Sequence, residues 1–228
     1  MFFWDPTYII VLPAILLAIY AQIRVQSTYR RFSEVPIANG LTGAQVAQEV
    51  LRRNGLSGVE IDRTDGMLSD HYDPRTRTLR LSSDVHDGIS VAAAGVAAHE
   101  TGHAIQHARG YAPLALRSAM VPTAQFGTFL AWPIFIFGFL FHSGTMLQLG
   151  ILIYSAVVAF TVVTLPVEFD ASARALRALR EESLVTADEL RGVRSVLTAA
   201  ALTYVAAAAT AVLELVRMLL LANARREE

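Results

Sequence analysis

The chain alternates between long apolar stretches and polar segments. Four apolar stretches approach or exceed the roughly 20 residues that an α-helix needs to cross a bilayer. The second and third carry no charged residue and are separated only by the turn sequence HSGT, so they predict a transmembrane hairpin. The fourth contains Glu214 and Arg217, which leaves open whether it crosses the membrane or lies at its surface. The stretches are Tyr8 to Ile23, Met120 to Phe141, Thr145 to Leu165 and Val196 to Leu221.

The polar region from about 32 to 118 is the only one large enough to fold around a core of its own. Its first part, LTGAQVAQEVLRRNG, predicts a helix that begins after Thr42 as N-cap. Gln45 would complete a capping box with Thr42, and Gly55 would end the helix. This segment therefore carries both a start and a stop signal.

The rest of this region predicts strands and a second helix. VEIDR and SDHYDPRTRTLRLS are typical of short strands, and the second sequence predicts a hairpin that turns at Asp73-Pro74. A helix is predicted from Asp84 to Ala108, with Gly110 after its end. The region is therefore expected to be a small α+β unit between membrane helices.

Composition agrees with a membrane protein, because 54% of the 228 residues are hydrophobic. The chain has no Cys, so any metal must be held by His, Asp, Glu or backbone oxygen. The net charge of −1 gives no reason to expect a nucleic-acid partner.

Arginines beside the apolar stretches predict their orientation, since basic residues stay on the cytoplasmic side. Arg24, Arg30 and Arg31 follow the first stretch, so the N-terminus is expected outside. Arginines also precede and follow the predicted hairpin, whereas its turn has none, so both flanks are expected in the cytoplasm.

The candidate chemistry lies in His99-Glu100-Thr101-Gly102-His103, an H-E-x-x-H motif on the second predicted helix. Residues four apart share a helix face, so His99 and His103 can reach one zinc ion. Glu100 can then act on a metal-bound water without being a ligand. His107 is excluded as a third ligand, because it lies about 12 Å along the helix axis from His99. His107 is instead expected to interact with the last carbonyls of the helix.

The third ligand must come from elsewhere, and LPVEFDASARA is the best place to find it. Pro166 is expected to open a helix there, and Glu168 would lie on the same side of the membrane as the motif. Spacing alone leaves Glu168, Asp170 and the acidic residues of the hairpin as alternatives, since zinc needs one carboxylate.

The sequences AAHETGHAIQHA, LPVEFDASARA and LTAAALTYVAAA resemble the YugP-type neutral zinc metallopeptidases of bacterial membranes, over nearly the whole chain. More distantly, the first two resemble the gluzincin membrane proteases, which include the CAAX-processing and heat-shock enzymes. In those enzymes, a Glu after the transmembrane hairpin is the third ligand.

The resemblance implies that His99, His103 and Glu168 bind zinc and that Glu100 is the catalytic base. In the distant relatives, an Asp four residues after the ligand Glu orients a ligand histidine. This chain has Ser172 at that position, so the orienting role falls to either Ser172 or Asp170.

We therefore expect a mainly α, polytopic membrane protein with three to four transmembrane helices and a small cytoplasmic α+β zincin-like catalytic region. Its predicted function is zinc-dependent endopeptidase at the bacterial inner membrane, with one Zn²⁺ per chain, an active site facing the cytoplasm and peptide or unfolded protein as substrate. The lipid bilayer is the other expected partner, and the pattern predicts no oligomeric state. The predicted organisation comprises an N-terminal anchor (1–31), the catalytic region (32–118), a transmembrane hairpin (119–165), a helical segment with the third ligand (166–195) and a C-terminal apolar helix (196–228).

Two alternative functions and one hypothesis about substrate binding also follow from the sequence. An intramembrane protease does not fit well, because only about ten apolar residues precede His99 and a polar segment comes before them. A non-catalytic membrane scaffold or adaptor would hold a structural zinc with four protein ligands, which leaves no position for chemistry. If the reading as a protease holds, the predicted hairpin either offers an edge strand to an extended substrate or only covers the helix.

Overall fold

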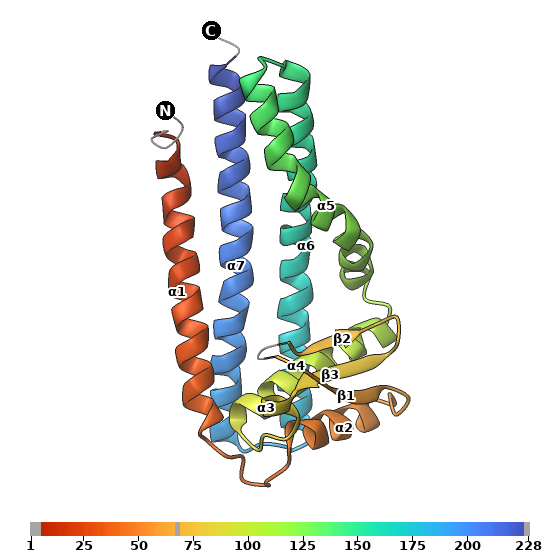
Figure 1. Ribbon diagram of the computed structural model, residues 1–228. Coiled ribbons are helices and arrows are strands. Elements are labelled where there is room, and N and C mark those ends of the chain that lie inside the picture. Colours follow the sequence, from red (N-terminus) through yellow and green to blue (C-terminus); the bar gives the residue numbers. More distant parts are fainter. Residues whose placement is uncertain (1–5, 67–68, 226–228) are drawn as a thin grey trace. The chain divides into compact units, whose positions relative to one another are not determined.

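The computed structural model describes residues 6–66 and 69–225, most of which are helical (Figure 1). The expected fold class, a mainly helical membrane protein with a small α+β region, is confirmed. The elements in chain order are α1 (Tyr8–Ser33), α2 (Gly43–Arg53), β1 (Glu60–Thr64), β2 (His71–Asp73), β3 (Thr78–Ser82), α3 (Ser83–His86), α4 (Val91–Ala108), α5 (Ala112–Leu140), α6 (Gly144–Glu181) and α7 (Ala187–Ala224).

Four of the described helices, α1, α5, α6 and α7, are long and apolar enough to cross a membrane. The fourth apolar stretch of the sequence lies within α7 and is therefore among them. The helix α4, which carries the H-E-x-x-H motif, has 18 residues and is not among them.

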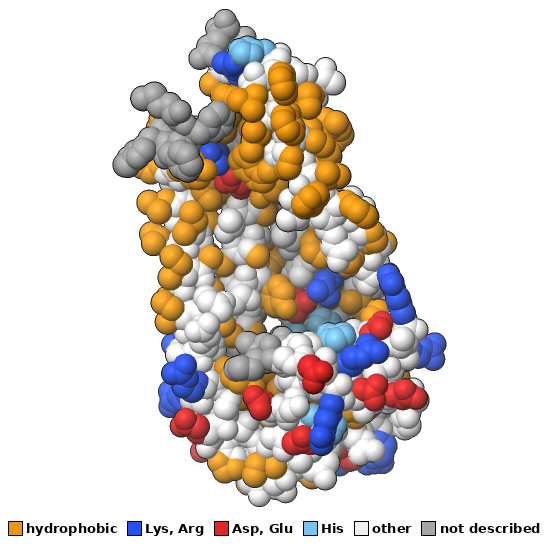
Figure 2. Space-filling view, viewed as in Figure 1, with side chains coloured by type: hydrophobic (Ala, Val, Ile, Leu, Met, Phe, Trp, Pro, Cys, Tyr) orange, Lys and Arg blue, Asp and Glu red, His pale blue; other side chains and the backbone are white. Residues whose placement is uncertain are grey.

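The described chain divides into two compact units. The first contains the described residues 6–22, 116–166 and 202–225. Its helices expose large apolar side chains, among them Phe126, Phe129 and Leu152, and Figure 2 shows hydrophobic side chains spread over their surface. Such an exposed apolar surface is expected where lipid surrounds a helix.

The two charged residues of α7 form an ion pair within this first unit, in which Arg217 is buried and Glu214 is half-buried. Arg217 donates a hydrogen bond to Glu214 (Nη1 to Oε1, 2.7 Å) and lies over the ring of Tyr8, 3.6 Å from its centroid. Because a charged side chain in an apolar segment needs a partner, this pairing explains how α7 can hold two charges and still be apolar enough to span a bilayer.

The end of α7 contacts the turn between α5 and α6. Arg225 hydrogen-bonds to the ring of His142 in this turn, and its guanidinium lies 5.0 Å from the ring centroid of Phe139. Within the first unit, the last turn of α7 therefore lies beside the turn of the α5–α6 hairpin.

The second unit contains the described residues 23–66, 69–115 and 167–201. Both predicted signals of α2 are confirmed: Thr42 and Gln45 form a capping box, and Gly55 follows the helix with a positive φ of 74°. The three strands are in the order β1-β3-β2, with β1 parallel and β2 antiparallel to β3. The predicted hairpin is therefore β2 and β3, and β2 is at the edge of the sheet.

Two apolar clusters form the core of the second unit. The larger joins α2 and α4 to the last part of α6 and the first part of α7, through residues such as Val50, Ala98, Leu179 and Val193. The smaller packs Leu79 and Leu81 of β3 against α2, α3 and α4. The motif helix α4 contributes to both clusters, so its position is fixed on two sides.

The prediction of one helix from Asp84 to Ala108 was wrong, because the chain breaks between α3 and α4. Residues 87–90 leave the helical path to pair with an earlier segment: Ile37 N–H donates to Ile89 O, and Val91 N–H donates to Val35 O, each at 2.8 Å. Ser90 then caps α4 by accepting a hydrogen bond from the Ala93 N–H. These long-range backbone contacts stabilise the break, which the turn pair Asp87-Gly88 and the cap Ser90 also mark in the local sequence.

The prediction that Pro166 opens a helix was also wrong, because Pro166 lies inside α6. Proline removes one backbone hydrogen bond and crowds the preceding turn, but long helices with partners on several sides can accommodate it. The consequence for the site is small. Glu168 and Ser172 are still four residues apart on one continuous helix, so they share a face.

Candidate metal centre

The site is built where α4 and α6 approach each other closely. A Cβ atom added to Gly102 would lie 2.5 Å from the carbonyl oxygen of Ala171, a distance at which something must shift. The glycine inside the H-E-x-x-H motif therefore lets the backbone of α6 come close to α4. This approach brings residues after Pro166 next to the two motif histidines.

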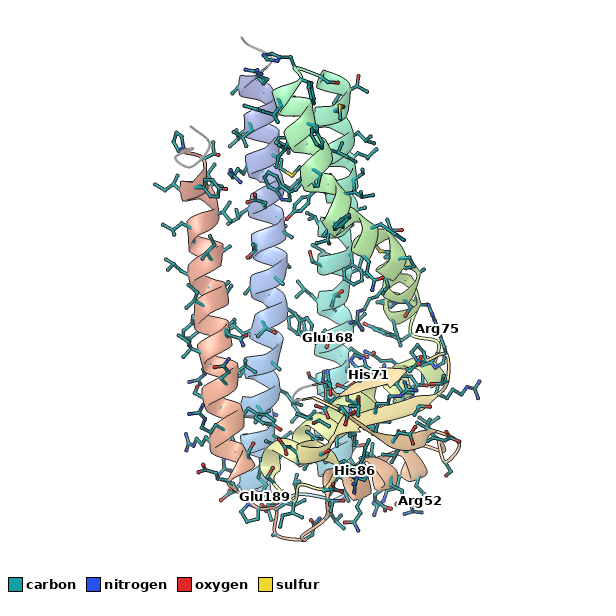
Figure 3. All side chains as sticks on the ribbon, in the orientation of Figure 1. Arg52, His71, Arg75, His86, Glu168 and Glu189 are labelled. Carbon is teal, nitrogen blue, oxygen red and sulfur yellow. The ribbon has the colours of Figure 1, made fainter. Side chains whose placement is uncertain are left out.

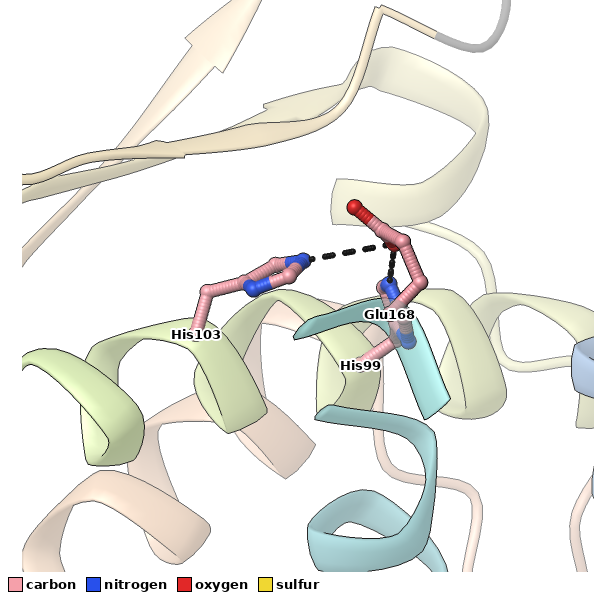
Figure 4. A group of neighbouring side chains, drawn as sticks. All are labelled: His99, His103 and Glu168. Carbon is pink, nitrogen blue, oxygen red and sulfur yellow. Dashed lines mark hydrogen bonds and ion pairs between the residues drawn. The ribbon is translucent and has the colours of Figure 1, made fainter. Parts of the chain in front are cut away.

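Glu168 extends from α6 and is buried, with 2% of its surface exposed (Figure 3). Its Oε2 atom lies 3.2 Å from Nε2 of His99 and 3.7 Å from Nε2 of His103 (Figure 4). The potential ligand atoms of these three residues all lie within 4.8 Å of one another. The structure thus brings together the three residues expected to bind metal.

The donor set fits a zinc ion. Zinc–nitrogen and zinc–oxygen bonds of about 2.0 to 2.2 Å in a tetrahedron place neighbouring ligand atoms about 3.3 to 3.5 Å apart. The two distances from Glu168 to the imidazoles, 3.2 and 3.7 Å, lie on either side of this range. Two imidazoles and one carboxylate also match the protein ligands of open zinc sites in peptidases.

The outer nitrogens of both imidazoles have partners, which orients the inner nitrogens toward Glu168. The Nδ1 atom of His99 lies 3.1 Å from the Ser172 hydroxyl, and Nδ1 of His103 lies 3.0 Å from the side-chain oxygen of Gln106. Partners of this kind fix ring orientation in metal sites. Of the two orienting candidates from the sequence, Ser172 contacts a candidate ligand directly.

Electrostatics in the site favour a cation. Burial of the His103 imidazole lowers its pKa, but the interaction with Glu168 and the negative charges of Glu100 and Glu168 outweigh burial and hold the pKa above its usual value. The same negative charges attract a metal ion, which competes with the proton for the imidazole nitrogen.

Glu100 is not part of this donor group. Its Oε2 atom accepts a hydrogen bond of 3.1 Å from the backbone N–H of Tyr72, the central residue of β2. Glu100 is also largely buried, at 8% exposure. Its carboxylate is therefore held on the side of α4 that β2 covers.

The remaining candidates lie outside the donor group. The Nδ1 atom of His107 is 2.9 Å from the Tyr72 hydroxyl, so this ring contacts β2 and not the helix carbonyls that we expected. Asp170 accepts hydrogen bonds from Arg174 and Gln106. The other three histidines, His71, His86 and His142, have polar partners elsewhere.

Gln106 was missed in the sequence analysis. It is fully buried and connects His103 to α6, through the Val167 carbonyl and Asp170. The available signal was a polar residue three positions after His103, directly after the apolar residues Ala104 and Ile105. Only the close approach of α6 shows what this side chain binds.

Comparison with known proteins defines the family. The profile of the family described as "Putative neutral zinc metallopeptidase" matches residues 7–223, and the chain belongs to this family. It is 42% identical over 215 residues to the "Putative membrane protease YugP" of Bacillus subtilis (strain 168), which covers 94% of this chain and 96% of that protein. No solved structure matches the chain significantly. The expected family resemblance is thus confirmed.

Replacing Glu168 with Gln tests the donor group. Glu168→Gln should weaken zinc binding by more than 100-fold, because it removes an anionic ligand, whereas loss of an orienting partner typically costs 10- to 100-fold. Ser172→Ala is the matched comparison, since it removes only the hydroxyl beside His99. A competitive zinc titration of both variants measures the difference, and equal affinities for Glu168→Gln and the parent would exclude Glu168 as a ligand.

Proposed function

We propose that this protein is a membrane-anchored zinc endopeptidase with His99, His103 and Glu168 as ligands and Glu100 as general base. The arrangement of these four side chains is the main support for the proposal. Three potential ligand atoms lie within 4.8 Å of one another, while the Glu100 carboxylate, from the same motif, binds a backbone N–H instead. Membership of a zinc metallopeptidase family supports the same chemistry.

A zinc ion held by these residues would act as a Lewis acid and lower the pKa of a bound water to about 7. Glu100 would take a proton from this water and deliver it to the leaving amine. The hydrogen bond from the Tyr72 N–H uses one carboxylate oxygen of Glu100, Oε2, so the other oxygen can receive the proton.

The number of donors favours catalysis over a structural zinc site. Among the described residues, the group that could hold a metal has three members, His99, His103 and Glu168. A closed structural site uses four protein ligands, whereas a catalytic site keeps one position for water or substrate. The three-member group therefore supports the protease and not the scaffold.

The edge strand β2 supports an extended peptide as substrate. In the described sheet, β2 pairs with β3 on one side only, and the Tyr72 N–H on its outer side points to Glu100. A peptide that added to this edge would pass beside the catalytic base and could donate to the Tyr72 carbonyl, since the Tyr72 N–H is already bound by Glu100. Such a substrate must be locally unfolded.

We further propose that the second unit faces the cytoplasm of a bacterial cell and that the protein lies in the inner membrane. Arg24, Arg30 and Arg31 in the second half of α1 support this orientation, because basic residues are retained on the cytoplasmic side. The turn at His142 would then lie on the outer side.

Replacing Glu100 with Gln tests the proposed mechanism. Glu100→Gln should leave zinc affinity unchanged, because the residue is not a ligand, and should lower kcat/KM by about 10² to 10⁴, the range typical of general-base loss. The assay uses an unfolded protein substrate, with the same protein in its folded form as a comparison that should resist cleavage. Glu49→Gln on α2 is the control and should keep full activity. Loss of zinc from Glu100→Gln would contradict the assigned role.

Cysteine labelling tests the orientation, because the natural chain has no Cys. Ser57 in the second unit and Gly144 at the start of α6 are exposed, and a Cβ at Gly144 meets no atom within 4 Å. A membrane-impermeant thiol reagent on intact cells should label Gly144→Cys but not Ser57→Cys, and permeabilised cells should show both. Labelling of Ser57→Cys in intact cells would place the site on the outer side.

A further inference from the structure

Gln106 is buried to an extent that is unusual for an amide. None of its surface is exposed, although it lies on α4 only three residues after His103. Burying an amide without hydrogen bonds costs free energy, so a buried glutamine needs partners for its oxygen and for both N–H groups.

All three hydrogen-bonding positions of the Gln106 amide are used. Its nitrogen donates to the Val167 carbonyl oxygen and to Oδ2 of Asp170, each at 2.8 Å, and its oxygen lies 3.0 Å from Nδ1 of His103. A carbonyl oxygen and an ionised carboxylate can only accept hydrogen bonds. The amide nitrogen must therefore face α6, and the amide oxygen must face His103.

The orientation of the Gln106 amide selects one tautomer of the His103 imidazole. Because the Gln106 oxygen can only accept, Nδ1 of His103 must carry the hydrogen. The neutral ring then has its lone pair on Nε2, the atom that lies 3.7 Å from the Glu168 carboxylate. His99 differs, because its partner is the Ser172 hydroxyl, which can either donate or accept and does not select a form of the ring.

We propose that Gln106 is the positioning residue for His103, and that it holds the imidazole in the form and orientation that bind the metal. Asp170 anchors Gln106 from α6 and is itself held by Arg174, whose Nε lies 2.6 Å from Oδ2 of Asp170. Both residues that the sequence offered for an orienting role therefore have one. Ser172 orients His99 directly, and Asp170 orients His103 through Gln106. The proposal rests on the zinc site of the proposed function.

The test compares a substitution in α4 with one at the N-cap of the same helix. Gln106→Met keeps the side-chain volume but removes all three hydrogen bonds, whereas Ser90→Ala removes one buried hydrogen bond, from the Ala93 N–H, at the far end of the helix. Gln106→Met should weaken zinc binding by about 10- to 100-fold, and Ser90→Ala by less than about threefold. The zinc affinity of the full-length protein is measured in detergent by competition with a chelator, beside the melting temperature of the metal-free protein.

The two measurements separate positioning from packing. A merely structural role for Gln106 would lower the melting temperature and leave zinc affinity unchanged, and that result would overturn the proposal.

If Gln106→Met does not fold, Asp170→Ala provides the test, since Asp170 is partly exposed and its loss frees one Gln106 N–H. Asp170→Ala should weaken zinc binding by at least about threefold, and unchanged affinity would overturn the proposal. A parent protein that binds no zinc would overturn the proposed function as well, whereas a zinc-binding parent with an unaffected Gln106→Met variant would overturn only the role of Gln106.

Discussion

The contact of the buried Glu168 carboxylate with His99 and His103 is the interaction on which the candidate metal centre depends. Removing an ionised carboxylate from water costs several kcal/mol unless positive charge or hydrogen bonds compensate. Here the imidazoles of His99 and His103 approach Oε2 from the neighbouring helix, and each compensates the carboxylate while its Nε2 carries a hydrogen. A divalent cation between these three groups would compensate more fully, so the same burial that is costly without a metal favours binding one.

Close backbone packing makes this arrangement possible. Gly102 allows α6 to approach α4 at Ala171, and the residues on either side of Ala171 then face the motif. Within less than two helical turns, α6 provides the third candidate ligand and the partners that orient both histidines, at Val167, Glu168, Asp170 and Ser172. The site is therefore a property of two packed helices, and β2 adds the hydrogen bond that holds Glu100.

The sequence predicts the local features of this protein well, because they depend on residues close to one another in the chain. The capping box of α2, the four membrane-length stretches and the spacing of His99 and His103 are of this kind. The break between α3 and α4 has local signals, the turn pair Asp87-Gly88 and the N-cap residue Ser90, which the prediction of one helix passed over. Its backbone bonds to residues 35–37 could not be predicted, because these partners are distant in the chain. The role of Gln106 could not be predicted for the same reason, since its partners lie about 60 residues away on α6. Position in the sequence alone did not distinguish Glu168 from the neighbouring acidic residues as the third ligand. The family resemblance was needed as well.

We propose that His99, His103 and Glu168 hold one zinc ion and leave a position open for water. X-ray absorption at the zinc edge of the purified protein can examine this coordination, because it counts imidazole ligands and gives bond lengths. We expect one zinc per chain, with two imidazole nitrogens at about 2.0 to 2.1 Å and oxygen ligands completing the shell. A zinc ion with three or more imidazoles, or a protein that retains no zinc when purified and none when zinc is added back, would contradict it.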